Sequence, residues 1–269
     1  MPTVRERLWL WGHEAGTHDG YFNLPGKSRI TPAEAAYYLD IPNLIMVRYD
    51  DKPAMPFDQL ALALRPLQQV HWSVVGAMGR STAAETEHVL ELAARFPNIT
   101  GIFLDDFFRD GAPDTAQSSG TESGALPLQE LQALRSRLVV AGRRLDLGVT
   151  LYTHQLEQPL RPYLDHCDLV SLWTWKSTDL EHLVANMHKC ETLAPHSVKF
   201  LGLYLWDYGL KQPMPLELMQ MQAELGLRWL REGRVGGLIF LASCICDLGL
   251  ETVEWSRDWI RRVGDELLP

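Results

Sequence analysis

Residues 101–108 read GIFLDDFF, an apolar run that ends in two aspartates and is followed by two phenylalanines. Seven further short apolar runs occur along the chain, and a stretch of helix-like pattern follows each of them. These runs occupy residues 8–11, 44–48, 70–75, 147–152, 169–175, 200–206 and 237–242. Eight strands that alternate with eight helices are typical of a (β/α)8 barrel, whose chemistry lies at the carboxyl ends of the strands. The sequence therefore predicts an α/β protein with the TIM-barrel fold.

The length of the chain fits one barrel. It has 269 residues, close to the roughly 250 residues of a typical (β/α)8 domain, so we expect a single domain over residues 1–269. Two connections are long, and both follow strands and so lie on the expected substrate face. Residues 15–30 carry His18, Tyr21 and Phe22, whereas residues 109–126 are rich in Gly, Ser, Ala and Asp. The second connection is a candidate lid, and an ordinary surface loop fits its composition equally well.

Charge and cysteine content restrict the partners and the compartment. The formal net charge is −9, and the acidic residues are spread along the chain, which provides no basic surface for nucleic acid or anionic lipid. No run approaches the ~20 apolar residues of a membrane-spanning helix. The four cysteines, Cys167, Cys190, Cys244 and Cys246, form no CxxC pair and fit buried thiols in a reducing compartment. We expect a cytoplasmic protein without nucleic-acid or membrane partners, and the oligomeric state is open.

The alternation of residue types within the runs predicts which side chains enter the barrel. Successive side chains of a strand point to opposite faces. From the fourth to the seventh run, one parity holds mainly glycine, hydroxyl-bearing, acidic and aromatic residues, while the other is almost purely aliphatic. The first parity therefore faces the interior. Extended to the first two runs, this rule places the following residues at the mouth of the barrel: Trp11, His13, Arg48, Asp50, Asp105, Tyr152, His154, Trp173, Trp175, Tyr204 and Trp206.

A mouth that combines aromatic rings with polar groups suits a polyhydroxylated ligand. The C–H faces of sugars stack on indole and phenol rings, and their hydroxyls bond to Asp, Arg and His side chains. We therefore expect a carbohydrate or glycoside as the small-molecule partner, bound by the mouth residues that surround Asp105. Trp9 and Phe103 lie deeper in their runs and fit the filling of the core.

The two aspartates at the end of the fourth run are candidates for catalysis. Carboxyl groups at the end of an apolar strand cost desolvation energy, and aromatic surroundings are expected to raise one pKa and leave the other group ionised. Hydrolysis of a glycosidic bond uses such a pair, one as acid and one as nucleophile or base. Parity places Asp105 inward, and Asp106 either completes the pair or caps the following loop. The leading candidate for the partner from another strand end is Asp207 by position, although parity counts against it, and Glu14, Asp50 and Asp106 follow.

With its eightfold pattern and its acidic fourth strand, the chain resembles the broad group of TIM-barrel glycoside hydrolases, several of which carry a GxxxDD-like or GxxxD-like end on that strand. The resemblance covers the whole chain. It implies cleavage of a glycosidic bond at the carboxyl face of the barrel by a carboxylate pair, without a cofactor or a metal ion. In chitinase-like enzymes the same strand carries a DxxDxDxE pattern, but Phe107 stands where their acid glutamate aligns, so their mechanism does not transfer.

Three other functions fit the same mouth. Schiff-base chemistry would use Lys176, although its parity is opposite to that of the two neighbouring tryptophans. A barrel that binds sugar without cleaving it would keep the aromatic residues, and it is favoured if no two carboxyl groups face each other across the pocket. A metal-dependent sugar-processing enzyme would bind its cation through N and O ligands, although no HxH or HExxH pair is present. The candidate ligands are His13, Glu14, Asp50, Asp105 and His154.

Overall fold

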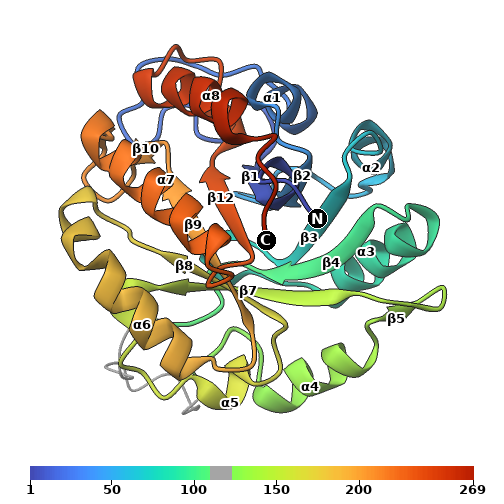
Figure 1. Ribbon diagram of the computed structural model, residues 1–269. Coiled ribbons are helices and arrows are strands. Elements are labelled where there is room, and N and C mark those ends of the chain that lie inside the picture. Colours follow the sequence, from blue (N-terminus) through green and yellow to red (C-terminus); the bar gives the residue numbers. More distant parts are fainter. Residues whose placement is uncertain (110–122) are drawn as a thin grey trace.

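The structure is a computed structural model that describes residues 1–109 and 123–269. Eight parallel strands close into a barrel in which each strand pairs with the next and the last pairs with the first (Figure 1). The strands are β1 (Leu8–Gly12), β2 (Asn43–Met46), β3 (Gln69–Val75), β4 (Ile99–Leu104), β7 (Asp146–Tyr152), β8 (Leu169–Trp173), β9 (Val198–Tyr204) and β12 (Gly237–Leu241). The prediction of a single-domain (β/α)8 barrel is confirmed.

The helices form a ring around the barrel (Figure 1). They are α1 (Pro32–Leu39), α2 (Asp58–Ala63), α3 (Ala83–Arg95), α4 (Leu128–Ser136), α5 (Arg161–Leu164), α6 (Leu183–Leu193), α7 (Leu216–Arg231) and α8 (Glu251–Val263). Among the described residues, no helix combines the length and apolar character needed to cross a membrane. Two short hairpins complete the fold: β5 (Val139–Val140) pairs with β6 (Arg143–Arg144), and β10 (Trp206–Asp207) pairs with β11 (Gln212–Pro213).

Two of the differences from the sequence prediction lie at strand ends. β2 ends at Met46 and β9 ends at Tyr204, each two residues before the end of the predicted run. Residues 206 and 207 instead pair with β11 in an antiparallel hairpin. Most of the candidate lid at residues 109–126 lies outside the described residues, because residues 110–122 are not described.

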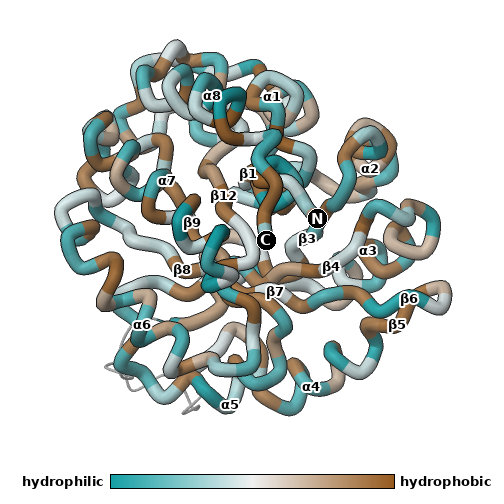
Figure 2. The backbone as a smooth tube through the Cα atoms, in the orientation of Figure 1, coloured by the Kyte–Doolittle hydropathy of each residue, from teal (hydrophilic) through white to brown (hydrophobic). Residues whose placement is uncertain are grey.

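Apolar residues concentrate on the barrel strands, whereas the surrounding helices alternate between hydrophobic and hydrophilic positions (Figure 2). As the parity rule predicts, the aliphatic residues of β4 and β7 are fully buried beneath the helices; they are Ile102, Leu104, Val149 and Leu151. Burial of such side chains contributes about 1.5–3 kcal/mol each. All four cysteines are also buried and unpaired.

Aromatic rings fill much of the barrel interior, and glycines on neighbouring strands make room for them. A Cβ atom on Gly148 would lie 2.5 Å from the Phe103 ring, and one on Gly202 would lie 2.2 Å from the Trp173 ring. These distances are far below van der Waals contact, so only glycine fits beside the rings. The rings form the floor below the mouth of the barrel.

The two ends of the chain meet over the amino end of the barrel (Figure 1). The backbone N–H of Val4 donates to the carbonyl of Glu266 at 2.8 Å, and the N–H of Leu268 donates to the carbonyl of Pro2 at 2.8 Å. These segments cover that end, so the carboxyl end is the one left for a ligand.

Candidate functional site

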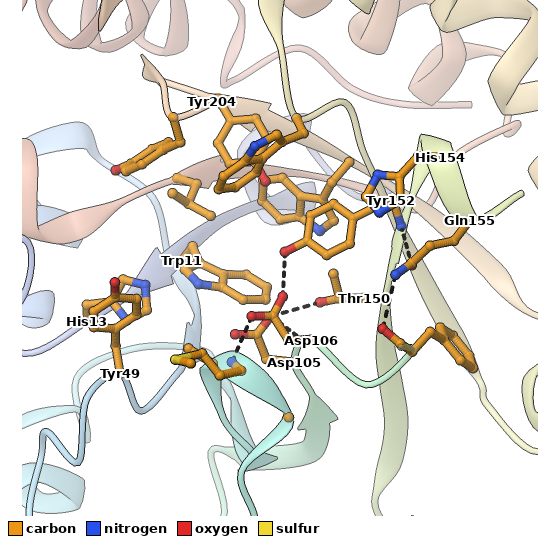
Figure 3. Close-up of a pocket in the computed structure, with 18 of the residues that line it drawn as sticks. Trp11, His13, Tyr49, Asp105, Asp106, Thr150, Tyr152, His154, Gln155 and Tyr204 are labelled. Atoms are coloured by element: carbon orange, nitrogen blue, oxygen red, sulfur yellow. Dashed lines mark hydrogen bonds between the residues drawn. The ribbon is translucent and has the colours of Figure 1, made fainter. Parts of the chain in front are cut away.

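A cavity of about 670 Å³ opens at the carboxyl end of the barrel. Figure 3 shows side chains from several strand ends converging on it, with the two aspartates of β4 at its wall. The principal lining residues are Trp11, His13, His18, Phe22, Tyr49, Met78, Asp105, Asp106, Phe108, Thr150, Tyr152, His154, Gln155, Trp173, Trp175, Tyr204, Tyr208 and Leu241. The size and the mixture of aromatic and polar groups are typical of a small-molecule site.

Asp105 directly follows β4 and is only 5% exposed. Its Oδ1 atom accepts hydrogen bonds from the Asp106 backbone N–H at 2.9 Å and from the Thr150 hydroxyl at 3.3 Å. Among the described residues, none donates a hydrogen bond to Oδ2. Burial, reinforced by the charge of Asp106, raises the pKa of Asp105 well above its ordinary value, because both effects disfavour the ionised form. Asp105 is therefore placed to keep a proton that Oδ2 can carry.

Asp106 enters the same cavity because its backbone is left-handed, with φ of 43°. Aspartate tolerates this conformation better than most residues, and the turn interrupts the alternation of the strand. The Tyr152 hydroxyl donates to Oδ1 at 2.6 Å, and the Met78 backbone N–H donates to Oδ2 at 2.8 Å (Figure 3). Burial raises the pKa of Tyr152 well above its ordinary value, so its hydroxyl keeps the proton that it donates. Asp106 is thus held as a hydrogen-bond acceptor.

Tryptophan and tyrosine rings pack around the carboxyl pair. The Trp173 ring lies 5.0 Å from the Tyr204 ring and 5.2 Å from the Trp11 ring, measured between centroids. A hydrogen bond from Trp173 Nε1 to the Ser171 hydroxyl at 2.8 Å fixes its orientation. Trp175 is different, because it is 36% exposed and stacks on Tyr208 at 6.3 Å. It therefore offers a ring to a ligand at the rim.

His13 and His18 line the cavity as neutral side chains. Burial lowers the pKa of His13 to about 4 and lowers that of His18 well below its ordinary value. The Nδ1 atom of His13 lies 3.1 Å from the Val47 carbonyl, which only accepts, so Nδ1 carries the proton. His18 Nδ1 pairs with the Tyr208 hydroxyl at 3.2 Å. Both rings provide polar contacts without charge.

Arg48 and Asp50 do not line this cavity. They lie in a smaller neighbouring hollow of about 420 Å³. Arg48 forms ion pairs there with Glu85 at 2.8 Å and with Asp51 at 2.7 Å, and Asp50 is exposed with a left-handed backbone. The parity rule does not extend to these residues because β2 ends at Met46.

Asp207, Trp206 and Glu14 also lie outside the cavity lining. Asp207 is fully buried and accepts backbone hydrogen bonds from Ser177 at 3.1 Å and Leu210 at 2.9 Å, which ties together the connections after β8 and β9. Trp206 donates from Nε1 to the Phe22 carbonyl at 3.0 Å. Glu14 is exposed on its loop. The structure therefore gives the buried members of this group local partners rather than access to a ligand.

The candidate metal ligands are not brought together. Within residues 1–109 and 123–269, no group of three or more His, Cys, Asp or Glu side chains is placed to hold a metal ion. Glu14 and Asp50 are exposed outside the cavity, away from the lining that includes His13, Asp105 and His154. Lys176, the candidate for Schiff-base chemistry, is exposed and does not line the cavity either.

Several lining residues were not selected from the sequence. Tyr49, Met78 and Tyr208 lie in connections that follow strands, where the strand alternation no longer applies. Aromatic residues within a few positions of a strand end would have been the signal for Tyr49 and Tyr208. Nothing in the pattern of residues points to Met78, whose contribution to Asp106 comes from its backbone N–H.

The fold is similar to several solved structures. A Bacteroides thetaiotaomicron protein assigned as an alpha-L-fucosidase matches with a TM-score of 0.60 and 11% identity, over 99% of this chain and 98% of that one. The xylanase-A-amylase inhibitor protein XAIP-III matches with a TM-score of 0.58 and 12% identity, over 96% and 99%. The Pyrococcus furiosus tryptophan synthase complex contains a chain that matches with a TM-score of 0.52 and 10% identity, over 98% and 99%.

At these identities the similarity shows the fold alone, and the three neighbours have different activities. No protein-family model matches the sequence, and no curated protein matches it either. The comparisons and the structure together define the fold as a (β/α)8 barrel. Its carboxyl end carries an aromatic cavity with two adjacent carboxyl groups.

Proposed function

We propose that the protein is a glycoside hydrolase-like enzyme that binds a carbohydrate in this cavity and cleaves a glycosidic bond with Asp105 and Asp106. The observation that carries the proposal is the pair itself. One carboxyl group is buried and favours its protonated form, and its neighbour accepts two hydrogen bonds. Glycosidases need carboxyl groups in these two states at the same time.

The two aspartates have different roles in this proposal. Asp105 donates its proton to the oxygen of the departing group, because its side chain lines the cavity and its Oδ2 atom has no hydrogen bond from the described residues. Asp106 is the hydrogen-bond acceptor of the pair, because the Tyr152 hydroxyl donates to one of its carboxylate oxygens and the Met78 N–H donates to the other. The negative charge of Asp106 also opposes ionisation of Asp105, so Asp105 keeps the proton that it donates.

The walls supply the binding energy. Trp175 presents a ring surface at the rim, where it is 36% exposed, whereas the rings of Trp11, Trp173 and Tyr204 are at most 3% exposed and form the base of the cavity. The C–H faces of a sugar ring pack on such surfaces, while its hydroxyls exchange hydrogen bonds with neutral groups such as His13. A carbohydrate is the ligand class that uses both kinds of wall.

Turnover of a panel of aryl α- and β-glycosides, with and without EDTA, tests the proposal. We expect Asp105→Asn to lower kcat/KM by about 10²–10⁴-fold, the typical contribution of a general acid. The matched control is Asp146→Asn, because burial also raises the pKa of Asp146, which lies at the amino end of β7. Equal losses in both variants, or an activity abolished by EDTA, would contradict the assignment.

A carbohydrate-binding barrel without catalysis is the second candidate function. Among the described residues that line the cavity, Asp105 and Asp106 are the only carboxyl side chains. They are neighbours on one strand end, so within residues 1–109 and 123–269 no second carboxyl group faces them across the cavity. Quenching of tryptophan fluorescence by free sugars, without turnover of any glycoside in the panel, would establish this function instead.

A further inference from the structure

The position of the two carboxyl groups restricts the source of the nucleophile. In a glycosidase with two opposed carboxyl groups, the second one attacks the sugar or activates water from the far face. Here both groups come from the end of β4, and the strands across the barrel contribute other side chains. These are Trp173 from β8, Tyr204 from β9, Leu241 from β12 and Trp11 from β1.

Three polar groups of the cavity, Tyr204, Tyr208 and His13, are poor substitutes for a second carboxylate. Burial raises the pKa of Tyr204 and of Tyr208 well above the ordinary value, so neither phenol is an oxyanion near neutral pH. Burial lowers the pKa of His13 to about 4, which makes that ring a weak base. Among these three described groups, none is a strong nucleophile or base, and the substrate itself is an alternative source of the attacking atom.

We propose that the substrate supplies this atom, and that the cavity cleaves glycosides of 2-acetamido-2-deoxy sugars through their own acetamido oxygen. The inference rests on the proposed function and names its substrate class. Asp105 and Asp106 lie side by side (Figure 3), so one can protonate the departing oxygen while the other accepts the acetamido N–H. Two adjacent carboxyl groups on one side of the sugar are sufficient for this reaction.

The first step forms one bond and breaks another. The acetamido carbonyl oxygen bonds to the anomeric carbon as the glycosidic C–O bond breaks, and the electron pair of that bond goes to the departing oxygen. That oxygen takes the proton of Asp105. The sugar is left as an oxazolinium ion, whose positive N–H donates to the carboxylate of Asp106.

Water completes the reaction in the second step. Its oxygen bonds to the anomeric carbon and passes one proton to the Asp105 carboxylate, and the C–O bond of the oxazolinium ring breaks to restore the acetamido group. The product is the free sugar with retained configuration, and Asp105 is again protonated. No oxidant, metal ion or covalent enzyme intermediate is needed.

The contacts of Asp106 fit an orienting role. The Tyr152 hydroxyl at 2.6 Å and the Met78 N–H at 2.8 Å fix both carboxylate oxygens, and each oxygen retains a lone pair for a further donor. The acetamido methyl group requires an apolar surface, and the side chains of Leu241 and Met78 line the same cavity. The site therefore matches both ends of an acetamido group.

The test compares 4-nitrophenyl glycosides of gluco- and galacto-configured sugars that carry either a 2-acetamido or a 2-hydroxyl group. We expect turnover of a 2-acetamido substrate and, for the corresponding 2-hydroxyl substrate, a kcat/KM at least ~100-fold lower. Replacing the acetyl group by mono-, di- and trifluoroacetyl withdraws electrons from the carbonyl oxygen. We expect kcat to fall stepwise along this series, by ~10-fold or more in total.

A substitution of Tyr152, which lines the cavity, provides a second test through its effect on kcat. Tyr152→Phe removes one hydrogen bond to Asp106, and we expect it to lower kcat on the 2-acetamido substrate by ~10-fold or more, the worth of a hydrogen bond to a charged group. Tyr38→Phe is the matched control, because the Tyr38 hydroxyl also donates to a carboxylate, that of Glu254, on the outside of the barrel. We expect Tyr38→Phe to leave kcat unchanged.

Two results would overturn the inference in distinguishable ways. Equal turnover of 2-hydroxyl glycosides, or a flat fluoroacetyl series, would leave glycoside hydrolysis standing and show that the nucleophile is not the acetamido oxygen. Absence of turnover with every glycoside, together with binding of N-acetylglucosamine or N-acetylgalactosamine detected by tryptophan fluorescence, would refute the hydrolase proposal as well.

Discussion

His71 offers a quantitative test of the barrel interior. It is 1% exposed, and its ring lies 4.6 Å from that of Trp9. Neither ring nitrogen has a hydrogen-bond partner among the described residues. Burial lowers the pKa of His71 from 6.5 to about 4. His71 therefore takes up a proton near pH 6.5 in the unfolded chain but only near pH 4 in the folded protein. Protonation of His71 favours unfolding as the pH falls from 6.5 to 4.

The magnitude follows from the two pKa values. A shift of about 2.5 units, at 1.36 kcal/mol per unit, corresponds to about 3 kcal/mol of stability lost once the pH is below 4. About 2 kcal/mol of this is already lost between pH 7.5 and pH 5. We therefore expect the free energy of unfolding of His71→Leu to fall about 2 kcal/mol less than that of the wild type over this interval.

Urea unfolding followed by tryptophan fluorescence at pH 7.5, 6 and 5 measures the effect. At pH 7.5 we expect the two proteins to agree within about 1.5 kcal/mol, because leucine has a similar volume and removes two unpaired polar atoms. The exposed His182 provides a control: His182→Leu should give a curve parallel to that of the wild type. The reasoning is refuted if His71→Leu gives a parallel curve as well.

Three further predictions concern the cavity. Asp106→Asn removes a charge that adds to the effect of burial on the pKa of Asp105, so the alkaline limb of the pH profile of kcat/KM should move to lower pH; an unmoved limb would contradict the coupling of the pair. Trp175→Ala removes the exposed ring of the rim and should raise KM about 10-fold with little change in kcat in steady-state kinetics, and an unchanged KM would show that no sugar stacks there. Gly202→Ala places a Cβ atom 2.2 Å from the Trp173 ring and should lower the free energy of unfolding by about 1–3 kcal/mol in urea unfolding. An unaltered urea midpoint would show that the Trp173 ring can move aside without loss of stability.

The sequence was informative where the backbone is regular. Eight apolar runs were sufficient to predict the barrel, and the parity rule placed Trp11, Asp105, Tyr152, Trp173 and Tyr204 toward the interior, where they line the cavity. In a barrel the alternation of a strand follows directly from closure of the sheet. Each of these residues belongs to a strand or lies one position beyond it.

The same rule was not reliable beyond the strand ends. Arg48 and Asp50 follow the end of β2 and line a neighbouring hollow, and the backbone of Asp50 is left-handed. Asp207 belongs to a hairpin that sequence periodicity does not reveal, and its buried carboxylate accepts hydrogen bonds from two backbone N–H groups. The position of Asp207 also depends on its contact with Ser177, 30 residues away in the sequence, so its side chain could not be placed from local pattern.

The glycines beneath the aromatic floor have a consequence for the diversification of this barrel. Because Gly148 and Gly202 touch the rings of Phe103 and Trp173, a larger residue at either position collides with a ring, and a smaller residue does not exist. The depth of the pocket is therefore difficult to tune by single substitutions. New ligand preferences should arise in the connections around the rim, while the floor remains nearly invariant in shape.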